Sequence, residues 1–202
     1  MKKVFLFAAL AVFGLSSINA GEGDEDNDAF TGGFSQGDYF VSGEIGYWSE
    51  KTGDNKNNIF HASPSVGYFL NDNIALSVGI NYESDKDENG SFEDTMTTFG
   101  GRLSASYFFN PEKRFNPYIK GGVGFESTKY EQTGSDESKA TGFRVRVAPG
   151  VNYHLSNCFS VYANLGGITY STLNPDGDGD STNEFHFDLG MKRLRFGARY
   201  QF

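Results

Sequence analysis

Six charged residues interrupt segments that are otherwise apolar or small, and they are the clearest candidates for chemistry. They are Glu44, Arg102, Lys120, Glu126, Arg144 and Arg146. Charged groups that leave water must be paired to be tolerated. If the fold brings these residues together, they can form a network of ion pairs or line a narrow path for ions. His61 and His154 lie in similar segments.

A second candidate site is the acidic stretch "NPDGDGDSTNE" at residues 174–184. Asn174, Asp176 and Asp178 occupy the first, third and fifth positions of a calcium-binding loop, with glycine at the sixth. The twelfth position falls on Phe185, where such loops place a glutamate, and no helices flank the stretch. This is a weak calcium candidate, and a flexible acidic tip is the simpler interpretation. We therefore expect no metal site.

These side chains must be positioned by β-strands, which the alternation of apolar and polar residues predicts. Period-two patterns recur along the chain and helical spacing does not. The strands predicted from this pattern cover residues 39–49, 58–70, 73–83, 95–109, 117–130, 141–155, 158–171 and 185–202. An even number of strands with 26 glycines and 16% aromatic residues predicts an all-β, eight-stranded antiparallel up-and-down transmembrane β-barrel.

The alternation also predicts which face of each strand meets lipid. In "FRVRVAPGVNYHL", Val145 and Val147 share one face, and Arg144 and Arg146 share the other. A cation that faces lipid near the membrane centre costs about 2–4 kcal/mol. We therefore expect the six charged residues inside the barrel. The outward set is apolar and includes Leu76, Val78, Leu103, Tyr107, Val123 and Phe125.

The predicted connections alternate in length. "ND" at 71–72, "SN" at 156–157 and "NPEKRFN" are short, whereas "EKTGDNKNN", "SDKDENGSFED", "TKYEQTGSDESK" and "TLNPDGDGDSTN" are long and polar. Outer-membrane barrels have short periplasmic turns and longer external loops. The alternative is a secreted lipocalin-like barrel or β-sandwich, which would enclose the apolar residues and expose the charges.

Two similar hairpins each carry a proline inside a strand. Pro64 in "PSVGYFL" and Pro149 in "PGVNYHL" occupy equivalent positions. Proline has no N–H to donate to a ladder, so it belongs at an edge or a bulge. We expect a local bulge or a skipped hydrogen bond at each position.

The N-terminal region has the features of an export signal. Lys2 and Lys3 precede the apolar run "VFLFAALAVFGL" and a small residue, Ala20. We interpret residues 1–20 as a signal peptide, 21–38 as an acidic, disordered periplasmic segment, and 39–202 as the barrel domain. The single cysteine, Cys158, excludes an internal disulfide.

The C-terminal strand carries a resemblance to a known family. In "LRFGARYQF" the outward residues are Leu194, Phe196, Tyr200 and the terminal Phe202. They resemble the signal by which the barrel assembly machinery recognises its substrates. With "PSVGYFL" and "NPYIKGGVGF", the chain resembles the small eight-stranded outer-membrane barrels, the OmpX-like proteins and the OmpA transmembrane domain.

The eighth predicted strand changes phase along its length. Phe185 and Phe187 lie on odd positions, whereas the C-terminal ladder lies on even ones. A bulge near Lys192 and Arg193 would keep both sets facing outward. Alternatively, residues 185–189 project beyond the bilayer.

The resemblance implies the cell outer membrane and a structural or surface-interaction role. The alternatives are a narrow porin-like channel and a lipid-modifying barrel enzyme. "HAS" at 61–63 and "HLS" at 154–156 are similar to the His-x-Ser spacing of barrel lipid A deacylases. Their catalytic face meets lipid, whereas here His61 and Ser63 are expected inside, so we expect no enzyme activity and no cofactor.

Charge indicates the partners. Five carboxylates and one lysine give residues 84–94 a net charge of −4, and residues 172–184 also carry −4. Acidic tips argue against nucleic acid, which needs basic patches. We expect a monomer that contacts outer-membrane lipid, the barrel assembly machinery and an external partner that the sequence does not identify.

Overall fold

The computed structural model describes residues 30, 32–90, 92–176, 180–188 and 194–202. The expected signal peptide and most of the acidic segment that follows it lie outside the described residues. None of the described residues belongs to a helix with the length and apolarity needed to cross a membrane.

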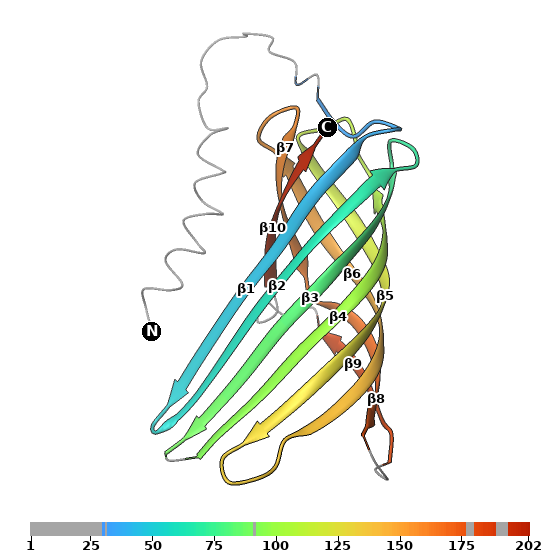
Figure 1. The fold of residues 1–202 in the computed structure, drawn as a ribbon. Helices are drawn as coiled ribbons and strands as arrows, with labels where there is room; N and C mark the ends of the chain where they lie inside the picture. The colour runs from blue at the N-terminus through green and yellow to red at the C-terminus, as the bar shows by residue number, and fades with distance from the viewer. Residues whose placement is uncertain (1–29, 31, 91, 177–179, 189–193) are drawn as a thin grey trace.

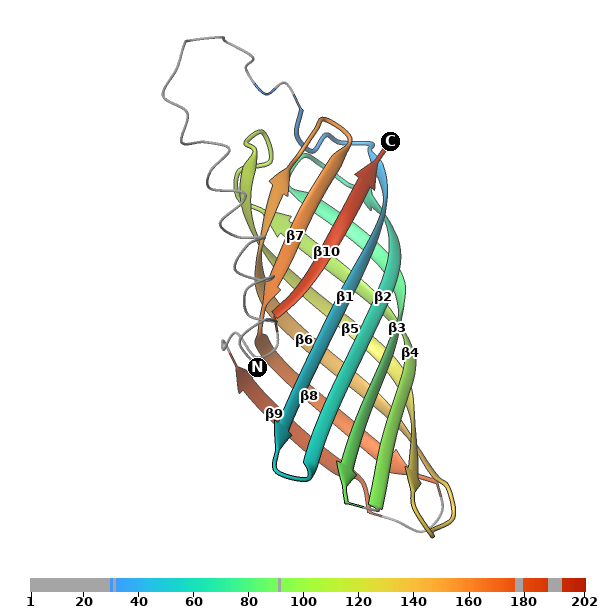
Figure 2. The same cartoon turned by 90° about the vertical axis from the view of Figure 1, so that its left-hand side faces the viewer.

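The described residues form a closed, eight-stranded antiparallel β-barrel, as predicted (Figures 1 and 2). The strand segments are β1 (Tyr39–Thr52), β2 (Asn55–Phe69), β3 (Ile74–Asn89), β4 (Phe92–Phe108), β5 (Phe115–Gln132), β6 (Ser138–His154), β7 (Phe159–Leu165), β8 (Gly167–Pro175), β9 (Thr182–Asp188) and β10 (Leu194–Gln201). β7 and β8 together form the seventh strand, and β9 and β10 occupy the eighth position. Pairing of β1 with β10 closes the ring.

The two ends of the barrel differ. At one end, called here the short-turn end, the strands are joined across residues 70–73, 109–114 and 155–158. At the other end the hairpins extend much farther than the sequence predicted. We call these extended parts of the hairpins the ribbons, and this end of the barrel the ribbon end. β3 continues to Asn89 and β6 already begins at Ser138. Most of the expected long loops are therefore β-structure.

Polar cross-strand contacts explain why the strands continue beyond their apolar faces. Asn57 donates from Nδ2 to Asp85 and Asp87 across the β2–β3 pair, at 2.8 Å in each case. Ser49 donates to Asn58 at 2.8 Å. Backbone pairing needs no apolar face, so the ladder persists where apolar alternation has ended.

The predicted faces are confirmed. Leu76, Val78, Leu103 and Val123 are exposed on the outer wall, whereas the inward Glu126 is 7% exposed. The outer wall also carries two rows of aromatic residues. The turn-side belt contains Tyr39, Tyr68, Tyr107, Phe109, Phe115, Tyr153, Phe159, Tyr200 and Phe202, and the ribbon-side belt contains Tyr47, Phe60, Tyr82, Phe99, Phe125, Phe143, Tyr170 and Phe185. Aromatic rows at two levels are typical of membrane interfaces.

Pro64 produces a skipped hydrogen bond without a bulge. The β2–β3 ladder pairs Ala62 with Tyr82 and resumes in the same register at Ser65 and Gly79. In the gap, the Ser63 hydroxyl donates to the Ile80 carbonyl at 2.7 Å. A side-chain donor therefore satisfies a backbone acceptor beside the proline.

Pro149 itself lies in an unbroken β5–β6 ladder, and the bulge found near it lies on the other neighbouring strand. β6 pairs with β7 through Gly150 and Asn164, but with β8 through Val147 and Ile168, a register that differs by one residue. The irregular residues are Gly166 and Gly167, with φ angles of 61° and 138°. Glycine adopts such angles without steric cost. The seventh strand thus changes phase here, which the sequence analysis did not predict.

Candidate functional site

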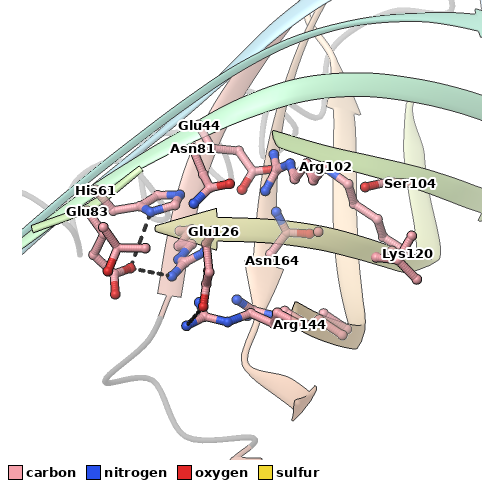
Figure 3. Close-up of a pocket in the computed structure, with 17 residues that line it drawn as sticks. Glu44, His61, Asn81, Glu83, Arg102, Ser104, Lys120, Glu126, Arg144 and Asn164 are labelled. Atoms are coloured by element: carbon pink, nitrogen blue, oxygen red, sulfur yellow. Dashed lines mark hydrogen bonds and ion pairs between the residues drawn. The ribbon is translucent and has the colours of Figure 1, made fainter. Parts of the chain in front are cut away.

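The barrel interior contains a charged cavity of about 90 Å³ (Figure 3). All six charged residues that the sequence placed inside line it. They come from four strands, β1, β4, β5 and β6, because inward positions at one level of neighbouring strands converge on the barrel axis. The structure therefore brings the predicted charged residues together.

Glu44 is the centre of the first ion-pair group. Its Oε1 accepts hydrogen bonds from Lys120 Nζ at 2.8 Å and from Arg102 Nη2 at 3.2 Å. The residue is only 5% exposed. One carboxylate on β1 thus pairs with two cations that reach it from β4 and β5.

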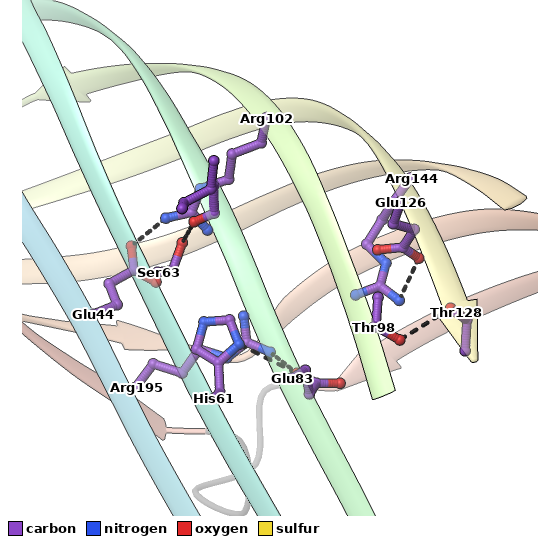
Figure 4. Close-up of polar contacts among 11 residues, drawn as sticks. Glu44, His61, Ser63, Glu83, Thr98, Arg102, Glu126, Thr128, Arg144 and Arg195 are labelled. Carbon is purple, nitrogen blue, oxygen red and sulfur yellow. Dashed lines mark hydrogen bonds and ion pairs between the residues drawn. The ribbon is translucent and has the colours of Figure 1, made fainter. Parts of the chain in front are cut away.

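A second group was only partly predicted. Arg195 Nη2 donates to Glu83 Oε2 at 3.0 Å, and His61 Nδ1 lies 3.3 Å from the same oxygen (Figure 4). Glu83 and Arg195 were missed by the sequence analysis. Both lie on the inward parity of their strands, so the rule that selected the other charges would have selected them too.

Glu126 and Arg144 form a third pair on β5 and β6, with 2.8 Å between Oε1 and Nη2. Nearby, the hydroxyls of Thr98 and Thr128 lie 3.0 Å apart (Figure 4). These contacts link the neighbouring strands β4, β5 and β6 on their inward faces. The pair extends the network toward the ribbon end.

Arg146 differs from the other cations of the cavity. Its Nη2 donates to the Gly166 carbonyl at 2.8 Å, at the bulge of the seventh strand. Among the described residues, no carboxylate lies within ion-pair distance of it. The irregular backbone of the bulge therefore supplies its acceptor.

Aromatic residues fill the lumen between the cavity and the short-turn end. We call this group the aromatic plug; its members are Phe34, Phe40, Phe69, Phe108, Tyr118 and Tyr162. The guanidinium of Arg199 lies 4.7–5.4 Å from four of these rings. Arg199, like Arg195, is inward on the last strand and was not among the predicted site residues. Burying these rings favours a filled lumen.

The plug corrects one expectation about the N-terminal segment. Residues 32–38 were expected to be disordered, but Phe34 is 3% exposed and packs against Phe69 and Phe108 at ring distances of 4.5 and 4.4 Å. The Gly33 carbonyl accepts a hydrogen bond from Gln201 Nε2 at 2.6 Å. The packing of Phe34 inside the lumen and the hydrogen bond from Gln201 on the last strand hold this part of the segment in place.

In the two His-x-Ser sites, Ser63 and His154 make contacts inside the barrel. Ser63 faces inward and donates to the Ile80 carbonyl, as described above. His154 is fully buried and its ring lies 4.6 Å from the ring of Phe34. His186, by contrast, is exposed and contacts Glu184 at 3.2 Å. Neither His61 nor Ser63 faces the outer wall, where the deacylases place their catalytic residues.

An acidic groove of about 350 Å³ lies at the ribbon end. We call it the ribbon groove. Its carboxylates are Asp85, Asp87, Asp94, Glu131 and Asp136, with Met96 and Tyr130 beside them. Asp85, Asp87 and Asp94 lie on the inward parity of their strands. Lys86 and Lys129 lie on the outward parity, together with carboxylates such as Glu131. The two faces of the ribbons therefore differ in charge.

Ion pairs join neighbouring positions on the outward face. Lys86 lies 3.3 Å from Glu88 and 2.8 Å from Glu93, and Lys129 lies 2.7 Å from Glu137. Hydrogen bonds from Lys86 and Lys129 hold the pKa values of Glu88 and Glu137 below the usual range. These carboxylates lie at the protein surface, so the contacts order side chains more than they stabilise the fold.

The calcium candidate is only partly within the described residues. Asn174 Oδ1 accepts a hydrogen bond from Ser181 at 2.6 Å, and the Asp176 N–H donates to the Lys139 carbonyl at 2.8 Å. Asp178 lies outside the described residues. In the part of the chain that the structure describes, no group of three acidic, histidine or cysteine side chains is arranged to hold a metal ion.

The C-terminal aromatic ladder lies on the outer wall. Phe196, Tyr200 and Phe202 are exposed, and the last two rings lie 5.0 Å apart. Phe185 and Phe187 are also exposed, so both halves of the eighth strand present their aromatic residues outward. The expected bulge at Lys192 and Arg193 lies outside the described residues. Recognition of Leu194 and this ladder by an assembly machinery stays a prediction.

Comparisons with known proteins agree with this architecture. The sequence model of the outer membrane protein beta-barrel domain matches residues 5–192. The solved structure of Neisserial surface protein A is similar at 19% identity and a TM-score of 0.52, covering 83% of this chain and 100% of that chain. A comparison with curated protein sequences found no significant match.

Two further solved structures cover a similar share of the chain. The N-terminal barrel domain of Pseudomonas aeruginosa OprF has 14% identity and a TM-score of 0.48, covering 83% of this chain and 98% of that chain. Ail, the attachment invasion locus protein of Yersinia pestis, has 13% identity and a TM-score of 0.45, covering 83% and 99%.

Proposed function

Because the chain belongs to the outer membrane protein beta-barrel domain family, we propose that it is a non-conducting outer-membrane barrel with a structural and surface-interaction role. In this proposal the barrel wall anchors the protein in lipid, and the ribbon end makes the external contacts. The ribbon groove, with its five carboxylates, supports a contact with a partner that carries positive charge.

The observation that carries the proposal is the closure of the lumen. Phe69 and Phe108 are fully buried in the aromatic plug, and Arg199 lies among the rings. On the side of the plug that faces the ribbon end, Glu44 holds Arg102 and Lys120 across the lumen. An eight-stranded barrel has an interior only wide enough for its own side chains. These layers leave the described lumen filled at the short-turn end.

A narrow channel is the second candidate, and the cavity itself favours it. Five cations and three carboxylates line about 90 Å³ of space, so a path opened through the plug would favour anions. In that case the plug would be a removable barrier.

Single-channel recording in planar bilayers separates the two functions. We expect the purified protein to stay silent in symmetric potassium chloride. A steady conductance that disappears in the Arg144→Ala/Arg146→Ala variant would overturn the proposal in favour of the channel. Protein folded in vesicles and assayed for heat-modifiable gel migration is the control, because it verifies that silent samples contain a folded barrel.

The proposed orientation places the short-turn end in the periplasm. Cys158 is exposed at this end and is the chain's one thiol, which provides a test. In intact cells, a membrane-impermeant maleimide should leave Cys158 unlabelled and should label an added thiol in Asn89→Cys at the ribbon end. Labelling of the native protein in intact cells would reverse the orientation.

The partners follow from the same arrangement. We propose that the two aromatic belts contact outer-membrane lipid and that the ladder from Leu194 to Phe202 is read by the barrel assembly machinery. We also propose export through residues 1–20 and a monomeric state. No catalytic role is proposed, and lipid A from cells with and without the protein should have the same mass profile.

A further inference from the structure

We infer that the cavity in the barrel interior binds a small monovalent inorganic anion, of the size of chloride, beside Arg144 and Arg146. The inference does not depend on whether the barrel conducts. It starts from the charges that line the cavity, which do not balance.

The cavity is lined by more cations than carboxylates. The cations are Arg102, Lys120, Arg144, Arg146 and Arg195, and the carboxylates are Glu44, Glu83 and Glu126. With His61 neutral, the lining carries a net charge of +2. Arginine does not lose its proton in proteins, so neutralisation by deprotonation is closed to four of the five cations. An excess of positive charge that is partly withdrawn from water is costly unless a counter-charge is present.

The ion pairs divide the excess of +2 between the group in which two cations share Glu44 and Arg146, which has no carboxylate partner among the described residues. Glu83 holds Arg195, Glu126 holds Arg144, and Glu44 is shared by Arg102 and Lys120. Arg146 is left with the Gly166 carbonyl, a neutral acceptor. A guanidinium has five N–H donors, and this contact uses one nitrogen.

A second unused hydrogen-bond donor belongs to Arg144, two residues before Arg146 on β6. Arg144 Nε is buried, and no hydrogen-bond acceptor contacts it among the described residues. Buried donors without acceptors are rare in folded proteins and indicate a missing water or ion. Arg144 and Arg146 are both inward on β6, so their guanidinium groups line the same cavity.

The volume limits the class of ligand. A space of about 90 Å³ holds a halide ion with a few water molecules, and it is too small for an organic phosphate or a sugar. Polar neighbours such as Asn81 and Ser104 line the same space and can complete the coordination of a hydrated anion (Figure 3).

Chloride titration of the full mature chain in zwitterionic micelles tests the inference. Chloride replaces gluconate at constant ionic strength, and ³⁵Cl NMR line broadening and the thermal unfolding midpoint are followed. We expect saturable broadening and a saturable rise of the midpoint. Arg146→Gln should weaken the apparent chloride affinity at least tenfold, whereas Lys129→Gln, which removes an outward lysine at the ribbon end, should leave it unchanged.

A second variant keeps the test decisive if Arg146→Gln fails to fold. Asn81→Asp adds a carboxylate to the cavity lining with almost no change of shape, so it should fold and should also weaken chloride binding at least tenfold. The inference is overturned if the native protein gives no saturable chloride response, or if Asn81→Asp responds to chloride as the native protein does.

Discussion

The short-turn end and the ribbon end are built from the same antiparallel ladder, yet they differ in what lies inside it. At the short-turn end the lumen is filled by the aromatic plug, and Phe34 enters it from outside the strands. At the ribbon end the inward face carries Asp85, Asp87 and Asp94, three of the carboxylates of the ribbon groove. Backbone pairing alone therefore does not distinguish an anchored region from a surface region.

The difference assigns stability and recognition to separate regions. Removing a buried charge or ring leaves an uncompensated group or a void, which is costly. Removing a solvated charge on a ribbon costs little. We therefore expect substitutions in the lumen to change the free energy of unfolding, and substitutions in the ribbons to change contacts with other molecules.

Glu44→Gln should give the largest effect. It removes the carboxylate that holds Arg102 and Lys120 and leaves two enclosed cations without their partner. We expect a loss of about 3–5 kcal/mol in the free energy of unfolding, measured by urea titration in lipid vesicles. Glu112→Gln at the exposed short-turn end is the matched control. Equal stability of the two variants would remove the distinction between lumen and surface.

Phe34→Ala should have the next largest effect. It empties a ring position between Phe69 and Phe108 in the plug, and we expect a loss of about 3 kcal/mol. The segment at 32–38 should then become accessible to protease, as limited proteolysis would measure. Phe92→Ala removes a ring that is 68% exposed on a ribbon and should change neither quantity. Protection that persists in Phe34→Ala would contradict the role of the plug.

Val147→Lys tests the outer wall between the belts. Val147 is exposed and lies on β6 between the two aromatic rows, so the lysine should cost about 2–4 kcal/mol in vesicles. Thr141→Lys has the same outward parity on the same strand but lies toward the ribbon end, and should cost less than about 1 kcal/mol. Similar costs for both would place the bilayer boundary elsewhere.

Acidification should give the smallest effect, confined to the ribbons. Lys86 and Lys129 depress the pKa values of Glu88 and Glu137 below the ordinary 4.5. A depressed carboxyl pKa contributes stability above 4.5 and loses it as the pH falls through the depressed value. Hydrogen exchange should show ribbon amides losing protection as the pH falls below 4.5, while the amides near Thr98 keep theirs. Uniform loss along the strands would contradict this local effect.

Much of the fold and part of the site could be predicted from the sequence, for one physical reason. A cation on the lipid face is expensive, so Arg144 and Arg146 decided the faces of their strand and, with Lys120, the location of the charged interior. The same rule would have found Glu83 and Arg195, because both lie on inward positions. The phase change at Gly166 and Gly167 was equally readable, since outward residues pass from odd positions at Leu165 to even ones at Ile168.

Other features could not be predicted, because no periodic pattern encodes them. Phe34 precedes the first strand, and its burial depends on Phe69, Phe108 and His154 from distant parts of the chain. The ribbons were interpreted as loops because their strands have no apolar face. Cross-strand polar pairs such as Asn57 with Asp85 become visible only once the register is known.

The position of Phe34 also implies an order of events during assembly. Its pocket is made by residues of β2, β4 and β6, and the Gly33 carbonyl beside it accepts from Gln201 on the last strand. That pocket is complete only after the first and last strands have met. The N-terminal segment should therefore dock last, so that its arrival marks a finished cylinder and its departure is the earliest step of disassembly.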